Sequence, residues 1–460
     1  MELPIEKLRN RFQDNWLLGD ESQSQTFISL TETLFQEIAE YPPQKILLSE
    51  PNPIRFLASF IAACSTNHHV FLANPSWGLS EWQQVFELVK PDIVWGNCEY
   101  AQQYNISFHN QSLPENKTNS LIMIPTGGSS GKIRFAMHNW QTLIASVKGF
   151  REYFQVSEVN SICVLPLYHV SGLMQFMRSF ILGGQLLILP FKELKTGKSC
   201  DFNPTNFFIS LVPTQLQYLL SESNLTTWLS QCQTVLLGGA PAWSDLLEKA
   251  RFHHIKLAPS YGMTETASQI ATLKPESFLS GKNSSYQVLP HAKVKICNAV
   301  GELLCSQKIG QIVIESSSLA LGYYPEPFPE SGIFYPDDLG FLDAEANLNI
   351  VGRSSYKIIT GGENVFPSEV EAAILSTNLV KDVAVIGKDD SYWGQIIAAI
   401  YVPINQNIAY QQIQDAINVK ITRLKIPKLW ISINIMPRNE QGKVNFQQLQ
   451  ELVNRHKALD

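Results

Sequence analysis

Seven short apolar runs, separated by segments with helix-like spacing, recur along the first two-thirds of the chain. Each run ends in proline, glycine or a polar residue, and apolar and polar positions alternate little within it. Near-continuous Val, Ile and Leu is typical of parallel strands that are covered on both faces. The pattern therefore predicts an α/β fold with ligands at the carboxyl ends of strands. The runs are 44–50, 68–74, 119–125, 161–167, 185–190, 207–213 and 233–240.

The pattern changes after about residue 290. Apolar and polar positions alternate there over short segments, which is typical of hairpins and predicts a more β-rich subdomain. These segments are 292–304, 310–318 and 347–353.

A second change follows the segment near Arg353–Ser355. Residues 367–388 predict a helix followed by a strand, residues 396–404 another strand, and residues 409–424 an amphipathic helix. Together they predict a small α+β unit. We therefore expect a large N-terminal domain over residues 1–353 and a small C-terminal domain over residues 354–460.

Composition narrows the class of protein. A chain of 460 residues with 45% hydrophobic and 17% charged residues is expected to form more than one packed unit with sizeable cores. The net charge of −6 provides no basic footprint for nucleic acid. The opening residues do not read as a signal peptide, and no apolar run is long enough for a transmembrane segment.

The cysteines are scattered, odd in number and without a CxxC pair, which predicts buried thiols in a reducing cytoplasm rather than disulfides or zinc ligands. They are Cys64, Cys98, Cys163, Cys200, Cys232, Cys297 and Cys305.

The stretch TGGSSGK, Thr126 to Lys132, follows an apolar run. Glycines allow successive N–H groups to face one centre, and the hydroxyls add neutral donors, so the stretch is a candidate phosphate loop. It does not match the nucleotide-triphosphate loop G-x-x-x-x-G-K-[ST], because Ile133 follows Lys132 and cannot bind magnesium. Taken alone, the stretch could equally be a surface turn.

Further segments downstream favour the phosphate loop over the surface turn, because they occur together in one order. The set resembles the signatures of the adenylate-forming superfamily, which includes acyl-CoA synthetases, peptide-synthetase adenylation domains and luciferases. The resemblance covers most of the chain from about residue 120 onward. The segments are LGGAPA (237–242), PSYGMTETA (259–267), YPDDLGFLD (335–343), GRSSYKIITGGENVFPSEVE (352–371) and NEQGKV (439–444).

The resemblance implies an enzyme that uses ATP and Mg²⁺ to convert a carboxylate to an acyl-AMP. Two anionic substrates must meet, so a cation is required. By resemblance Lys443 supplies it and stabilises the transition state at the α-phosphate, and Glu265 binds Mg²⁺. The resemblance assigns the remaining nucleotide contacts to Thr126, Gly127, Gly128, Ser129, Ser130, Gly131, Lys132, Gly238, Gly239, Ala240, Pro241, Ser260, Tyr261, Gly262, Thr264, Asp338 and Arg353. Among these, Tyr261 is expected to face adenine and Asp338 to bind the ribose hydroxyls.

The same resemblance implies that the small domain rotates between two half-reactions about a hinge at Ser355. The glycines of residues 360–364 would then border the path of a pantetheine arm. Three positions depart from the family pattern: Asp337 replaces a usual glycine, Tyr356 stands where an aspartate is common, and Arg134 keeps a second charge in a loop that lacks the usual proline and last glycine.

Residues 165–184 and 210–220 resemble the corresponding segments of 2-succinylbenzoate–CoA ligases of menaquinone and phylloquinone synthesis. By this resemblance His169 lines the acyl pocket, coenzyme A is the co-substrate, and Arg178 and Ser171 lie in the stretch where a second carboxylate could bind. A histidine at a strand end that only completes its own hydrogen bonds is the simpler alternative for His169.

Other functions stay open on the sequence. A CoA ligase for another aromatic or branched acid, a carrier-loading adenylation domain and an inactive adaptor are the alternatives. No carrier segment follows, and Lys443, Glu265 and Asp338 are all present, which favours an active small-molecule ligase. A homo-oligomer is compatible with the sequence.

Overall fold

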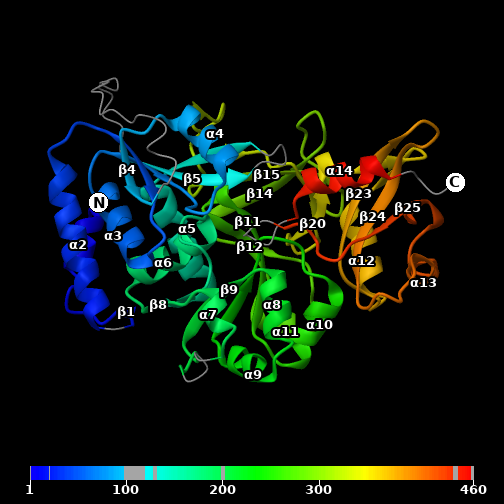
Figure 1. Cartoon of the computed structure of the whole chain (residues 1–460), viewed down its shortest axis with the longest axis horizontal. Coiled ribbons are helices and arrows are strands. Elements are labelled where there is room, and N and C mark those ends of the chain that lie inside the picture. The colour runs from blue at the N-terminus through cyan, green and yellow to red at the C-terminus, as the bar shows by residue number, and fades with distance from the viewer. Residues whose placement is uncertain are drawn as a thin grey trace.

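The computed structural model describes residues 2–19, 21–97, 120–127, 132–197, 202–438 and 444–456, with the side chains of residues 21–23 and 127 left out. Four sheets organise this part of the chain. Figure 1 shows the N-terminal helices at one end of the molecule and the sheet formed by the last hundred residues at the other.

A seven-stranded sheet has the order β17-β16-β6-β5-β3-β2-β4. Strands β5, β3, β2 and β4 run parallel, with β4 at the edge, and β6 returns antiparallel to β5. The strands are β2 Lys45–Ser49, β3 His69–Leu72, β4 Ile93–Gly96, β5 Leu121–Gly127, β6 Ile133–Asn139, β16 Gly322–Tyr323 and β17 Glu326–Pro327. The helices that precede or connect these strands are α1 Pro4–Arg9, α2 Glu21–Ala39, α3 Pro53–Cys64 and α4 Leu79–Val89.

An eight-stranded sheet has the order β1-β8-β7-β9-β10-β11-β12-β13 and is parallel from β1 to β11. Its strands are β1 Leu17–Leu18, β7 Asn160–Cys163, β8 Leu186–Ile188, β9 Phe207–Leu211, β10 Thr234–Leu237, β11 Leu257–Met263, β12 Ser268–Thr272 and β13 Gln287–Val288. Its helices are α5 Trp140–Phe154, α6 Val170–Leu182, α7 Phe191–Leu194, α8 Pro213–Leu219, α9 Ser223–Gln231, α10 Ser244–Phe252 and α11 Pro275–Leu279, with the 3₁₀ turn η3 at Thr264–Thr266.

The predicted α/β fold is confirmed, because all seven apolar runs contain a strand of these two sheets. The buried side chains of the two sheets and their helices form large apolar clusters that share neighbouring elements. The carboxyl ends of β5, β10 and β11 carry the glycine-, serine- and tyrosine-containing segments that the sequence singles out.

The β-rich region is confirmed as a five-stranded antiparallel sheet. It comprises β14 Ala292–Cys297, β15 Gly310–Ser316, β18 Ile333–Phe334, β19 Asp338–Leu342 and β20 Leu348–Arg353. In this sheet Asp338 lies directly opposite Arg353.

The last sheet has β22-β21-β24-β23 in order, with β25 parallel to β24. Its strands are β21 Ile358–Thr360, β22 Glu363–Val365, β23 Val380–Asp390, β24 Gly394–Pro403 and β25 Leu429–Ser432. The 3₁₀ turn η4 at Ser354–Tyr356 joins β20 to it, and its helices are α12 Pro367–Leu375, α13 Tyr410–Ile417 and α14 Phe446–Arg455, with η5 at Arg423–Lys425.

Two sequence expectations need correction. The helix expected over residues 409–424 ends at Ile417, where the chain turns: the N–H groups of Lys420 and Ile421 both donate to the Ile417 carbonyl, and Val419 is exposed. Cys305 is exposed rather than buried, since it lies in the connection between β14 and β15. None of the helices in the described ranges is long and apolar enough to cross a membrane.

Candidate active site

The candidate phosphate loop connects two paired strands. Thr126 and Gly127 end β5, and β6 begins at Ile133, with Thr126 directly opposite Arg134. Lys132 and Arg134 are both exposed. Gly128, Ser129, Ser130 and Gly131 lie outside the described residues. Two cations therefore lie at the end of the hairpin next to the connecting loop, where an anion could bind.

The residues predicted to form the adenine slot lie where β10 ends beside β11, with Leu237 opposite Pro259. The Ser260 hydroxyl donates to the Leu237 carbonyl at 3.1 Å, and a Cβ on Gly238 would lie 3.2 Å from this hydroxyl oxygen. Gly239, which has a φ of +85°, Ala240 and Pro241 follow on the exposed side. At Gly262, a Cβ would lie 2.1 Å from the Ser268 carbonyl oxygen, so only glycine fits the irregular pairing of β11 with β12.

Tyr261, Asp338 and Arg353 form one polar group. The Tyr261 hydroxyl donates to Oδ2 of Asp338 at 2.7 Å, and Nε of Arg353 lies 3.3 Å from Oδ1. Asp338 is 7% exposed, whereas the Arg353 side chain is half exposed. Burial, and then the Asp338 carboxylate, raise the pKa of Tyr261 well above its usual value. The structure thus brings together three predicted site residues from β11, β19 and β20.

The turn η3 that carries Thr264 and Glu265 is anchored through its backbone. Nε2 of buried His138 bonds the Thr264 carbonyl at 2.8 Å, and the Ala320 N–H donates to the Glu265 carbonyl at 2.7 Å. The hydroxyl of Ser318 donates to the Thr266 carbonyl at 2.9 Å. These three hydrogen bonds hold the backbone carbonyls of the turn. They do not use the side chains of Thr264 and Glu265.

Glu265 is 7% exposed and accepts a short hydrogen bond from the Tyr323 hydroxyl. The guanidinium of Arg134 lies over the Tyr323 ring at 4.1 Å from its centroid, so the phosphate hairpin and the Glu265 carboxylate contact the same tyrosine. Within the described ranges no group of three or more His, Cys, Asp or Glu could hold a metal ion. A single carboxylate is compatible with Mg²⁺, because this ion usually takes its remaining ligands from phosphate oxygens and water.

His169 is the N-cap residue of α6 and is buried, with its ring against that of Tyr168. Nine residues further along α6, Arg178 is 2% exposed. Its Nη2 donates to the Ser268 hydroxyl at 3.0 Å and to Oε1 of Gln269 at 3.2 Å, and its guanidinium lies over Phe150.

No described carboxylate pairs with Arg178, and burial lowers its pKa to about 9. Nε of Arg178 and both ring nitrogens of His291 are buried without a partner among the described residues. Burial, and then Arg178, lower the pKa of His291 to about 4, so the ring is neutral. Gly149 makes room for this ring, since a Cβ there would lie 1.8 Å from Nδ1. A buried guanidinium without an acid is a strong candidate for binding an anion.

The expected hinge residue Ser355 lies in η4, directly after β20. Its N–H donates to Oδ2 of Asp337 at 3.1 Å, and the Ser354 N–H donates to the Asp337 carbonyl at 2.8 Å. Lys443 lies outside the described residues.

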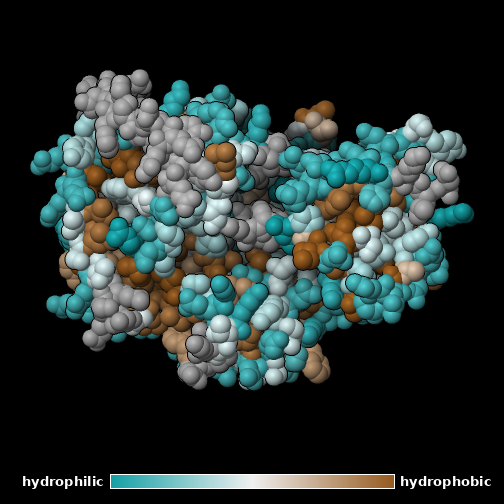
Figure 2. Space-filling view, viewed as in Figure 1, coloured by the Kyte–Doolittle hydropathy of each residue, from teal (hydrophilic) through white to brown (hydrophobic). Residues whose placement is uncertain are grey.

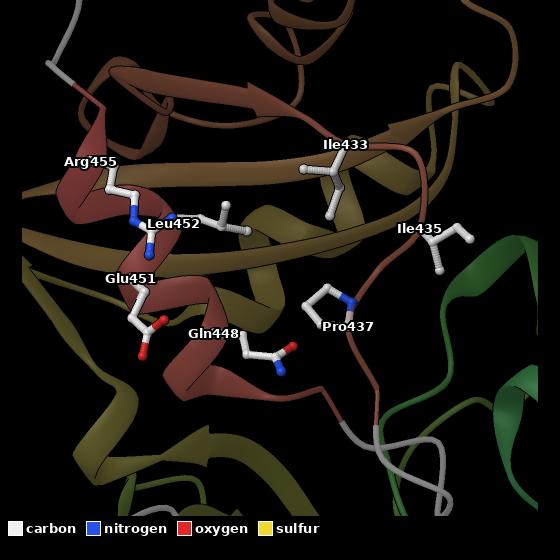
Figure 3. Close-up of a pocket in the computed structure, with 7 residues that line it drawn as sticks. All are labelled: Ile433, Ile435, Pro437, Gln448, Glu451, Leu452 and Arg455. Carbon is white, nitrogen blue, oxygen red and sulfur yellow. The ribbon is translucent and has the colours of Figure 1, made fainter.

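A cavity of about 300 Å³ elsewhere is lined by none of the predicted site residues. It lies between α14 and the segment after β25, where the side chains of Ile433 and Leu452 point toward it (Figure 3). Figure 2 shows an apolar patch on this face next to α14.

Comparison with known proteins shows the family of this chain. The profile of the AMP-binding enzyme family matches residues 40–324, more than half of the chain, and that of the AMP-binding enzyme C-terminal domain matches residues 369–443. The chain belongs to the AMP-binding enzyme family. The 2-succinylbenzoate–CoA ligase of Enterococcus faecalis is 31% identical over 349 residues, covering 75% of this chain and 72% of that protein. The corresponding ligase of Listeria monocytogenes is 33% identical over 333 residues, covering 71% and 68%.

Solved structures show the same fold for this AMP-binding enzyme. The Bacillus subtilis o-succinylbenzoate CoA synthetase in complex with its acyl-adenylate intermediate has a TM-score of 0.84 at 23% identity and covers 99% of each chain. The same protein in complex with ATP and magnesium ion has a TM-score of 0.81 at 24% identity, covering 96% of this chain and 99% of that one.

Sequence reasoning missed several residues of this AMP-binding enzyme that hold the site together. Tyr323, His291 and His138 stand outside the quoted motifs, although His138 follows Lys132 by only six residues, and a single histidine or tyrosine carries no local signal of its contacts. The β5–β6 and β6–β16 pairings place His138 and Tyr323 beside η3, whereas His291, directly before β14, packs against Gly149 near Arg178.

Proposed function

We propose that this chain is an ATP-dependent acid–thiol ligase that converts 2-succinylbenzoate to its CoA thioester through an acyl-AMP. The observation that carries the substrate assignment is the buried guanidinium of Arg178, which has no described carboxylate partner. The curated relatives named above are 2-succinylbenzoate–CoA ligases, and that activity supports the same assignment.

The reaction takes place in two steps at one centre. A carboxylate oxygen of the acid attacks the α-phosphorus of ATP, and pyrophosphate leaves. The thiol of coenzyme A then attacks the acyl carbon, loses its proton, and AMP leaves with the electron pair of the broken C–O bond. The first step brings two anions together, which costs several kcal/mol per close charge pair at about 4 Å without counter-charges.

Residues at the ends of β5, β10, β11 and β19 fit the nucleotide. Asp338 would bind the ribose hydroxyls and Tyr261 would face adenine, because the two side chains are already in contact at 2.7 Å. Lys132, Arg134 and the N–H groups of the hairpin would bind the phosphates. Glu265 would hold Mg²⁺, which supplies charge neutralisation for the phosphates when bound.

Lys443 remains our candidate for the cation that bridges the acid and the α-phosphate. We assign it to a C-terminal domain, residues 354–460, that rotates about Ser355 so that the glycines of residues 360–364 replace the lysine for the second step. The separate sheet of β21–β25, joined to β20 by the short turn η4, supports this division.

Arg178 would bind the second carboxylate of the acid. His169, at the start of the same helix, would lie near the reacting carboxylate. The two carboxylates of the acid would then be bound at different points along α6. A charge-assisted hydrogen bond to a buried guanidinium is worth roughly 1.5–3 kcal/mol. Acids that lack a second carboxylate would leave this cation buried and unpaired, which disfavours them.

The test is pyrophosphate release with ATP and Mg²⁺, comparing 2-succinylbenzoate with benzoate, succinate and a medium-chain fatty acid. We expect 2-succinylbenzoate to have a kcat/KM at least about 100-fold higher than the others. Equal values for all four acids would overturn the substrate assignment. A carrier-loading function would appear as acyl-AMP formation without thioester formation on free coenzyme A.

We further propose that the protein acts in the cytoplasm, where ATP, coenzyme A and reduced thiols coexist, and that its product serves menaquinone or phylloquinone synthesis.

A further inference from the structure

A tyrosine holds one of the two oxygens of the Glu265 carboxylate. Glu265 is 7% exposed, and its Oε1 accepts a short hydrogen bond from the Tyr323 hydroxyl. No described residue donates a hydrogen bond to Oε2. Burial, and then the Glu265 carboxylate, raise the pKa of Tyr323 above its usual value, so the hydroxyl keeps its proton and acts as the donor. One carboxylate oxygen is therefore fixed in direction, and the other is available as a ligand.

The ring of Tyr323 is itself held in place. Tyr323 belongs to the short strand β16, where it pairs with Ala136 of β6. Its ring meets that of Phe328 edge-on, with centroids 5.3 Å apart. The guanidinium of Arg134, two residues before Ala136 on β6, lies 4.1 Å from the centroid of the tyrosine ring. Together these contacts restrict the positions open to the hydroxyl that bonds Glu265.

Tyr323 and Glu265 also lie within electrostatic reach of two other parts of the candidate site. Burial raises the pKa of Tyr323, and the positive charges of Arg134 and Arg353 oppose this change. Burial is likewise the main cause of the raised pKa of Tyr261, and the charge of Glu265 adds to it. The pair therefore stands close to both a cation assigned to the phosphates and the group assigned to the ribose.

We propose that Tyr323 is a positioning residue for the metal ion of Mg·ATP, because its hydroxyl holds Oε1 of Glu265 and leaves Oε2 to the ion. This inference rests on the proposed function. Mg²⁺ demands near-ideal octahedral geometry, so its binding depends on the direction of each protein ligand. A partner that fixes a ligating side chain contributes roughly 10- to 100-fold to metal affinity. Loss of the Tyr323 hydroxyl should therefore weaken the effect of Mg²⁺ on ATP binding rather than ATP binding itself.

The test compares the Kd for ATP in Mg²⁺ with the Kd for ATP in EDTA, both by isothermal titration. In the wild type we expect Mg²⁺ to lower the Kd, since the ion offsets the repulsion between the Glu265 carboxylate and the phosphates. In Tyr323→Phe the Kd in EDTA should stay within about twofold of the wild type, whereas the Kd in Mg²⁺ should rise by about tenfold. The Mg²⁺ concentration that gives half-maximal ATP binding should rise by about the same factor.

The neighbouring residue provides a matched control. Tyr324→Phe removes the hydroxyl of a tyrosine whose ring packs edge-on against Phe71, with centroids 4.9 Å apart, and should leave both Kd values unchanged. Glu265→Gln is the reference in which the effect of Mg²⁺ is lost. Tyr323→Phe added to Glu265→Gln should cause little further loss, because both changes act on one metal ligand.

The reference variant distinguishes failure of this inference from failure of the proposed function. If Glu265→Gln loses the effect of Mg²⁺ but Tyr323→Phe keeps it, this inference is overturned. It is also overturned if Tyr323→Phe weakens ATP binding equally in Mg²⁺ and in EDTA. If Glu265→Gln itself keeps the full effect of Mg²⁺, the metal assignment in the proposed function fails instead.

Discussion

The Tyr261 hydroxyl donates a hydrogen bond of 2.7 Å to the Asp338 carboxylate, although the two residues lie 77 positions apart in the chain. Arg353 approaches the other carboxylate oxygen at 3.3 Å. Each oxygen of Asp338 thus has a partner that fixes its direction, and a carboxylate retains acceptor capacity beyond two hydrogen bonds. Under the proposed function, this arrangement would present Asp338 to the two ribose hydroxyls.

Removing the tyrosine hydroxyl should therefore weaken nucleotide binding. In Tyr261→Phe the ring remains but Asp338 loses one donor, so we expect the Kd for ATP to rise by about tenfold, which corresponds to about 1.4 kcal/mol. Isothermal titration with ATP and Mg²⁺ measures it. Tyr286→Phe is the control, since that half-buried tyrosine lies on a neighbouring segment. An unchanged Kd in Tyr261→Phe would show that Asp338 does not depend on this contact.

Arg178→Gln should change which acid is used rather than the use of ATP. Loss of the buried cation removes the partner of the second carboxylate, so we expect KM for 2-succinylbenzoate to rise by about 100-fold while KM for ATP changes little. Steady-state pyrophosphate release gives both constants. Arg151→Gln, which removes an exposed arginine on α5, is the control. A variant that loses both substrates alike, or that no longer melts cooperatively, would contradict a role in recognising the acid.

Ser355→Pro tests the hinge. Proline removes the N–H that Asp337 accepts at 3.1 Å and fixes the backbone angle φ, so rotation of the C-terminal domain should be hindered. We expect acyl-AMP to form at a rate within a few-fold of wild type, whereas its conversion to thioester falls by at least about tenfold. Quenched single-turnover measurements resolve the two steps. Equal rates for the second step in both proteins would argue against motion at this position.

The buried histidines predict how stability depends on pH. Burial lowers the pKa of His138 to about 4, and burial together with Arg178 does the same for His291. In the unfolded chain each histidine binds its proton near pH 6.5, but in the folded protein only near pH 4. The contribution of the two histidines to the free energy of unfolding is therefore fully present above pH 6.5 and is lost as pH falls toward 4. Each histidine contributes up to about 3 kcal/mol to this loss.

Urea unfolding of the wild type and of His138→Gln between pH 7 and pH 5 measures this effect. The variant should be less stable at pH 7 because Thr264 loses a donor, yet its stability should fall less between pH 7 and pH 5 than that of the wild type. A parallel fall in both proteins would contradict the assignment of this histidine.

Much of the fold could be predicted because local signals agree with the final structure. The apolar runs at 44–50 and 233–240 became buried parallel strands, as near-continuous Val, Ile and Leu predicts. The end of α13 at Ile417 could not be predicted, since the apolar spacing continues in the sequence and only tertiary packing decides where the helix ends.

In the candidate site, too, the sequence predicts some residues, whereas other contacts depend on tertiary packing. Tyr261, Glu265 and Asp338 stand in recognisable segments, and the structure brings Tyr261 and Asp338 into contact. The contacts of His138 with Thr264, and of Tyr323 with Glu265, depend on strand pairing between distant segments, so no spacing in the sequence reports them.

Under the proposed function, this chain joins an organic acid to AMP before a thiol takes part. The most direct measurement mixes the protein with ATP, Mg²⁺ and 2-succinylbenzoate without coenzyme A, quenches the reaction, and identifies the bound product by mass spectrometry. We predict about one equivalent of 2-succinylbenzoyl-AMP per active chain, which disappears into the thioester when coenzyme A is added and does not form in Lys443→Ala. Formation of ADP and phosphate, or no mixed anhydride from any acid, would contradict the account.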